Sequence, residues 1–111
     1  MTDKELLEWA AKAGEIIGAY YKGIFNDDYV EGILTVDKDG NDYCWNSLQD
    51  DGDALRLAVK LGMVLELNID EGWVHAYKHT TKASSEPTGD DPYTATRRAI
   101  TRAAAQIGRA S

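Results

Sequence analysis

Cysteine and histidine are the side chains here best suited to nucleophilic or metal chemistry, and the chain has few of them. Cys44, the only cysteine, lies in the strand-like segment 43–46 with no base beside it in the sequence. His75 and His79 lie four residues apart in another strand-like segment, where they would be about 13 Å apart and unable to share a metal ion. A buried thiol and the polar face of an edge strand explain these residues equally well. The sequence therefore predicts no enzyme, no metal site and no cofactor.

Three aspartates, Asp50, Asp51 and Asp53, stand at the start of a predicted helix. Their spacing is similar to the opening of a calcium-binding EF-hand loop. However, Leu55 and Gly62 stand where that loop needs an oxygen ligand and a glutamate. Aspartates at this place cap the first turn and lie at the positive end of the helix dipole. We interpret them as a helix cap and keep all three as candidate residues for binding a partner protein.

Basic residues are concentrated in the last predicted helix. Residues 92–111 hold four arginines and no acid, whereas residues 1–91 have a formal charge of −11. On a helix, Arg98, Arg102 and Arg109 fall on one face. This arginine stripe is either a solvated face near the helix C-terminus, a contact surface for an acidic partner, or an intramolecular partner of the aspartates at 50–53.

The formal charge of the whole chain, −7, argues against a general binder of nucleic acids or anionic membranes. The acidic balance fits simple solubility, and it also fits a face that imitates nucleic acid and occupies a basic groove on another protein. Trp73 and Tyr77, together with Tyr43 and Trp45, are candidate interface aromatics, with packing in the core or a sheet as the alternative. Without a membrane-length apolar run or a signal-peptide pattern, a cytoplasmic protein is expected.

The first third of the chain predicts a helix followed by a strand. Thr2 and Glu5 have capping-box spacing, and Gly14 is a plausible helix end. Residues 16–22 are expected to form a strand because they are rich in aromatic and β-branched side chains. Their apolar spacing also continues the helical period, so one long helix through Gly14 and Gly18 is the alternative.

Residues 26–28 are expected to form a turn, and the turn residues at 38–41 and 70–72 separate strand-like segments, which indicates two hairpins. Gly62 and Gly108 are expected to end the second and third helices. The predicted order is strand, strand, helix, strand, strand, loop and helix, over residues 31–37, 42–45, 52–61, 63–69, 73–79, 80–90 and 92–107. These elements predict one α+β domain over residues 1–111, with a four- or five-stranded, mostly antiparallel sheet and three helices packed on it.

Two segments of the chain match patterns of a known family. They are WN at 45–46 with DDGDALRLA at 50–58, and DPY at 91–93 with TRRAI at 96–100 and RAAA at 102–105. The chain resembles small phage and prophage proteins of the α/β/α sandwich kind, including NinX-type relatives, over residues 45–62 and 90–108. The resemblance implies a phage origin and a compact α+β domain, and it brings no catalytic residues.

We therefore expect a phage-encoded, non-enzymatic accessory protein that binds and modulates or inhibits a host protein. The partner would be a basic, nucleic-acid-binding protein, and an anti-defence factor of the anti-CRISPR kind is one form of this hypothesis. The alternative is a homo-oligomeric structural or regulatory phage protein, in which the last helix or an edge strand pairs with its copy. An enzyme of another type that uses Cys44, His75 or His79 is the third hypothesis.

Overall fold

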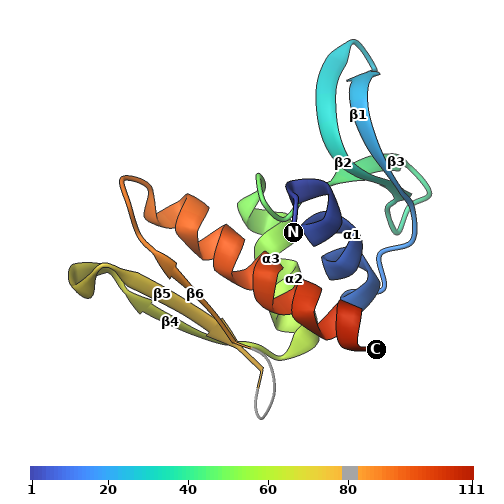
Figure 1. Cartoon of the computed structure of the whole chain (residues 1–111). Helices are drawn as coiled ribbons and strands as arrows, with labels where there is room; N and C mark the ends of the chain where they lie inside the picture. The colour runs from blue at the N-terminus through green and yellow to red at the C-terminus, as the bar shows by residue number, and fades with distance from the viewer. Residues whose placement is uncertain (79–82) are drawn as a thin grey trace.

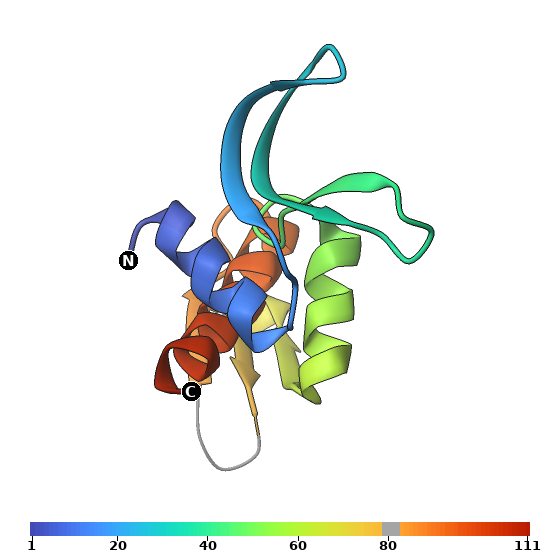
Figure 2. The same ribbon diagram turned by 90° about the vertical axis from the view of Figure 1, so that its right-hand side faces the viewer.

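Two three-stranded antiparallel sheets lie on either side of three helices in the computed structural model, which describes residues 1–78 and 83–111 (Figures 1 and 2). Sheet A has the strand order β1-β2-β3 and sheet B the order β4-β5-β6. The elements in chain order are α1 (Asp3–Ala13), β1 (Ala19–Phe25), β2 (Asp28–Val36), β3 (Asp42–Trp45), α2 (Asp51–Leu61), β4 (Val64–Asn68), the single 3-10 turn η1 (Ile69–Glu71), β5 (Trp73–Tyr77), β6 (Ala83–Pro87) and α3 (Pro92–Ala110).

The helices form the middle layer of the molecule. α3 packs on sheet B, and α1 and α2 lie between α3 and sheet A (Figure 1). Side chains from all three layers meet in one core, for example Leu7 of α1, Ile33 of β2, Val74 of β5 and Ala103 of α3, all at most 1% exposed. Each sheet therefore buries one face against the helices. This order of layers differs from the α/β/α order of the family that the sequence resembles.

The N-terminal helix forms as predicted, and the strand expected over residues 16–22 is found three residues later, over Ala19–Phe25. The Thr2 side chain accepts from the Glu5 N–H and the Glu5 carboxylate accepts from the Thr2 N–H, which completes the capping box. The helix ends at Gly14, so the alternative of one long helix is excluded. Gly18 passes so close to β2 that a Cβ there would lie 1.9 Å from the Leu34 carbonyl oxygen. The glycine therefore allows the chain to enter β1 in close contact with β2.

Strands β1 and β2 form a hairpin, here called the arm, that projects from the body of the molecule (Figures 1 and 2). Asn26 and Asp27 connect the strands, and both have a left-handed backbone, with φ of 52° and 69°. Two consecutive residues of this conformation are typical of the tight turn that suits the twist of a hairpin. The arm tip is apolar as well as acidic, since Ile24 is 63% and Tyr29 61% exposed.

The prediction of one four- or five-stranded sheet is wrong, because the strands form two sheets of three. α2 carries the chain from one side of the helical layer to the other, so β4 starts far from β3. The prediction of a loop over 80–90 is also wrong for residues 83–87, which form β6 and pair with β5. Backbone pairing with β5 outweighs the polar composition of that segment. Residues 80–82 lie outside the described residues.

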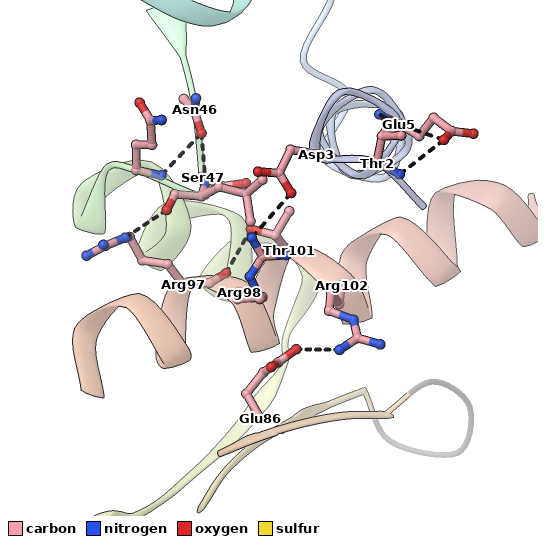
Figure 3. A network of polar contacts seen from close by, with 12 residues as sticks. Thr2, Asp3, Glu5, Asn46, Ser47, Glu86, Arg97, Arg98, Thr101 and Arg102 are labelled. Atoms are coloured by element: carbon pink, nitrogen blue, oxygen red, sulfur yellow. Dashed lines mark hydrogen bonds and ion pairs between the residues drawn. The ribbon is translucent and has the colours of Figure 1, made fainter. Parts of the chain in front are cut away.

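Gly108 does not end the third helix, which continues to Ala110. A Cβ at Gly108 would lie 1.9 Å from the carbonyl oxygen of Trp9. The glycine therefore allows the backbones of α1 and α3 to approach closely. Ser47, in the turn after β3, shares a buried 2.8 Å hydrogen bond with Thr101, which joins that turn to α3 (Figure 3).

Candidate protein-binding surface

The negative charge of the protein is concentrated in residues 26–53, here called the acidic end. This stretch holds nine of the nineteen carboxylates and one of the twelve Lys and Arg side chains, so its formal charge is −8 and that of the remaining chain is +1. It comprises the arm tip, β2, β3 and the start of α2, which lie at one end of the molecule (Figure 2). A charge count taken segment by segment along the sequence would have found this end.

Asp53 is the interior member of the acidic end, and its side chain is only 1% exposed. Its carboxylate accepts from the N–H of Asn46 at 2.9 Å, from the Arg56 guanidinium at 2.8 Å and from the hydroxyl of Tyr43. Burial and the hydrogen bond to Asp53 raise the pKa of Tyr43 to about 12. Asp53 thus joins α2 to β3, and the structure does not bring this candidate binding residue to the surface.

The other two aspartates of the cluster are exposed. Asp50 caps α2 by accepting from the N–H of Asp53 at 2.8 Å, so the predicted helix cap is confirmed. Asp51 pairs with Arg97 of α3 at 2.6 Å. Arg97 also donates to the Leu48 carbonyl (Figure 3). These two carboxylates remain accessible to a partner but already serve the fold.

Four other carboxylates of the acidic end have no structural role of this kind. Asp27 and Asp28 lie at the arm tip, and Asp39 and Asp42 lie at the turn between β2 and β3. All four residues are exposed, and within the described part of the chain their carboxylates make no hydrogen bond or ion pair. They are therefore the carboxylates best placed to meet a partner, and the sequence-based candidates did not include them.

The outer face of sheet A, turned away from the helices, contains a shallow apolar hollow. Ile33 and Trp45 point inward and are buried, so the alternating residues of β2 and β3 point outward. The hollow has a volume of about 340 Å³, and its lining consists of Ile17, Phe25, Leu34, Thr35, Val36 and Asp42. Two of these side chains are largely exposed, Ile17 at 86% and Val36 at 60%. Apolar and acidic groups thus share one surface.

A larger groove of about 1000 Å³ separates the β2–β3 hairpin from α2. Its floor includes the buried side chains of Trp45 and Leu57. Lysine and arginine side chains alternate with carboxylates in its lining, among them Lys38, Arg56 and Glu15. This mixture of charges favours no class of ligand.

The outer face of sheet B is aromatic. Val74 and Ala76 are fully buried under α3, so Trp73, His75 and Tyr77 share the opposite face of β5. Trp73 is 47% exposed, and its ring is parallel to that of His75 within 6°, with 6.5 Å between the centroids.

Neighbouring strands hold two of these rings. The Tyr77 hydroxyl donates to Glu66 at 2.7 Å, and His75 Nδ1 shares a 2.7 Å hydrogen bond with Ser85. The structure therefore brings the candidates Trp73 and Tyr77 to one surface. His79 lies outside the described residues.

The arginines of α3 bind carboxylates of other elements (Figure 3). Arg98 pairs with Asp3 at 3.2 Å, and Arg102 pairs with Glu86 of β6. Pairing of the arginine stripe with the aspartates at 50–53 is therefore wrong, because Arg97, outside the stripe, makes that contact. Two of the three stripe residues serve to hold α1 and sheet B to α3.

Cys44 lies half-buried on β3, and burial raises the pKa of its thiol. Among residues 1–78 and 83–111, no group of three or more His, Cys, Asp or Glu side chains is arranged to hold a metal ion. In the same residues, no helix is both long and apolar enough to cross a membrane. Comparisons with protein-family models, with curated proteins and with solved structures find no significant match.

Proposed function

We propose that this protein is a non-enzymatic binding protein that docks on a basic surface of another protein through its acidic end. The observation that carries the proposal is the charge of −8 within residues 26–53, against +1 in the rest of the chain. Carboxylates gathered on one surface attract a cationic partner over distance and set the association rate and orientation. The four carboxylates at the arm tip and the β2–β3 turn are the ones that a partner would meet first.

The proposed partner is a host protein with a nucleic-acid-binding surface, since such a surface is rich in Lys and Arg. Occupying it would modulate or inhibit that protein. The resemblance to phage proteins supports a host target, and a factor directed against a host defence complex, as an anti-CRISPR protein is, would act in this way.

A self-assembling module is the second candidate, and the exposed aromatic face of sheet B favours it. Three strands of five residues measure roughly 14 by 17 Å, or about 240 Å². A stable dimer buries about 800 Å² on each partner. Sheet B would thus need additional surface to hold a dimer, which places this candidate second.

The test compares three versions of the chain, each immobilised and exposed to host lysate at low and high salt. The first is the wild type, and the second carries Asp27→Asn, Asp28→Asn, Asp39→Asn and Asp42→Asn. The matched control removes four exposed charges elsewhere, with Glu8→Gln, Asp70→Asn, Glu71→Gln and Asp90→Asn. Mass spectrometry identifies the retained proteins.

We expect the wild type and the control to retain the same basic protein at low salt and to release it at high salt. The variant of the acidic end should retain at most about one tenth as much of this basic protein as the wild type. Equal retention by all three versions, or retention of neutral partners only, would refute the proposal. Light scattering on the purified chain distinguishes the second candidate, which requires an oligomer.

A further inference from the structure

The outer face of sheet A combines two features that bear on the kind of segment a partner inserts there. Its hollow is lined mainly by apolar side chains, with Phe25 from the arm tip at one end and Ile17 and Val36 at the other. Ile17 is 86% exposed. Covering such a hydrophobic side chain with a partner lowers the free energy of the complex. This face is therefore suited to apolar contact as well as to charge.

Carboxylates stand at both ends of the hollow. Asp28 is paired with Phe25 across the arm, and Asp42 is paired with Val36 across β2 and β3. Asp39 lies in the turn next to Asp42, and none of these three carboxylates has a partner in the described part of the chain. A ligand that covers the apolar residues would thus meet negative charge on both sides.

Strand addition at the free edge of sheet A is a less favourable way to bind. The edge strand is β1, and the Tyr21 hydroxyl donates at 2.6 Å to the backbone oxygen of Ile24 on that strand. In a hairpin with a two-residue turn, Ile24 points its backbone groups away from β2, so the tyrosine occupies an acceptor that an added strand would need. The face of the sheet is more open than its edge.

We propose that the outer face of sheet A seats a basic amphipathic helix of the partner protein. The apolar stripe of the helix covers Phe25, Leu34 and Val36, and its Lys or Arg side chains reach the carboxylates at the two ends of the hollow. The inner face of each sheet already packs its apolar side chains on helices of this chain. This inference rests on the proposed function and specifies what enters the acidic end.

The probe is a synthetic, fluorescently labelled peptide of leucine and lysine, about 14 residues long and thus about 21 Å as a helix. Its leucines lie on one face, and a control peptide of the same composition has them spread around the helix. Fluorescence anisotropy with the full chain gives both dissociation constants. We expect the peptide with the leucine face to bind about tenfold more tightly, because only that peptide can bury its leucines in the hollow.

Two matched substitutions locate the site. Val36→Ser should weaken binding of the amphipathic peptide about fivefold, because Val36 is in the hollow. Val59→Ser should leave binding unchanged, since Val59 is on α2 and is 72% exposed. Both valines lie largely on the surface, so both variants should fold. Amide resonances of β2 should shift when the peptide is added, and those of sheet B should not.

The outcomes separate the two proposals. If both peptides bind equally, lose affinity with salt and ignore Val36→Ser, the helix inference is wrong and the electrostatic docking stands. If neither peptide binds at low salt, the proposed function fails together with the inference. Preference for the amphipathic peptide that Val36→Ser abolishes and Val59→Ser preserves supports both.

Discussion

Sheet A and sheet B each pack one face on the same helical layer, and a carboxylate joins each sheet to a helix. The carboxylate belongs to the helix in one case and to the sheet in the other. In sheet A the helix provides it, because Asp53 of α2 accepts from Tyr43 and Asn46 of the β3 region. In sheet B the sheet provides it, because Glu86 of β6 binds Arg102 of α3. The Asp53 side chain is 1% exposed and the Glu86 side chain is 11% exposed, so both carboxylates are largely buried. The two contacts differ in their partners: Asp53 accepts hydrogen bonds from three groups, two of them on the β3 region, whereas Glu86 binds the half-exposed Arg102.

The outer faces differ as much as the inner ones. Sheet A has an apolar hollow among carboxylates, and it extends into an arm that stands clear of the body. Sheet B is shorter and presents Trp73, His75 and Tyr77, with the polar atoms of two of them bonded to neighbouring strands. One sheet thus has free charges for a partner, and the other has most of its polar groups paired.

The largest expected effect comes from removing the carboxylate of sheet A. Asp53→Ala leaves the buried N–H of Asn46 and the hydroxyl of Tyr43 without their acceptor, so it should lower the free energy of unfolding by about 3 kcal/mol. Urea denaturation measures the loss. Asp51→Ala is the control, because its exposed pair with Arg97 should contribute about 1 kcal/mol or less. Equal losses for the two variants would contradict the role assigned to Asp53.

A smaller effect is expected at the corresponding carboxylate of sheet B. Glu86→Gln replaces the charge and keeps most of the shape, and the half-exposed Arg102 can turn to water. The free energy of unfolding should fall by about 1 kcal/mol, again by urea denaturation. A loss as large as that of Asp53→Ala would remove the proposed difference between the two sheets.

On the outer face of sheet B, Trp73→Ser should change the free energy of unfolding by less than about 1 kcal/mol, because the indole is half exposed. Binding of the amphipathic leucine–lysine peptide should be unchanged, which fluorescence anisotropy would verify. Loss of peptide binding in this variant would move the partner site from sheet A to sheet B.

A further prediction concerns alkaline pH. The pKa of Tyr43 is about 12 in the folded chain, and an unfolded tyrosine has a pKa near 10. The unfolded chain loses this proton first, so the stabilisation by Tyr43 is complete below about pH 10 and is lost as the pH rises towards 12. Stability curves of the wild type and Tyr43→Phe should therefore converge over that interval. Curves that stay parallel would show that the hydroxyl proton is not held by the fold.

The sequence was sufficient for most elements because their signals are local. The capping box at Thr2, the turn at Asn26 and the aspartate cap of α2 all act within a few residues. Trp73, His75 and Tyr77 share one face of β5, as their alternation predicted, but the interpretation as an edge strand is wrong, because β5 is the central strand of sheet B.

Long-range contacts explain what the sequence did not reveal. Gly108 reads as a helix end, yet its role is set by Trp9, ninety-nine residues earlier. The segment 83–87 becomes a strand only because β5 lies beside it. Likewise, Asp53 and Asp51 both stand in the first turn of α2, and the contacts with Tyr43 and Asn46 that accompany the burial of Asp53 come from the preceding strand region. The charge of the acidic end can be counted along the sequence, but which of its carboxylates are bound internally depends on contacts of the folded chain, such as those of Asp53 and Asp51.

The contact between α1 and α3 also governs the order in which the molecule can assemble. Asp3 pairs with Arg98, and Lys12 donates to the backbone oxygen of Ser111, so the helical layer is closed by segments almost a hundred residues apart. Bringing such distant segments together costs chain entropy before any of their contacts form. Chains dominated by remote contacts fold more slowly than helical bundles of similar length. During synthesis, the helical layer on which both sheets pack is therefore complete only after α3 has left the ribosome.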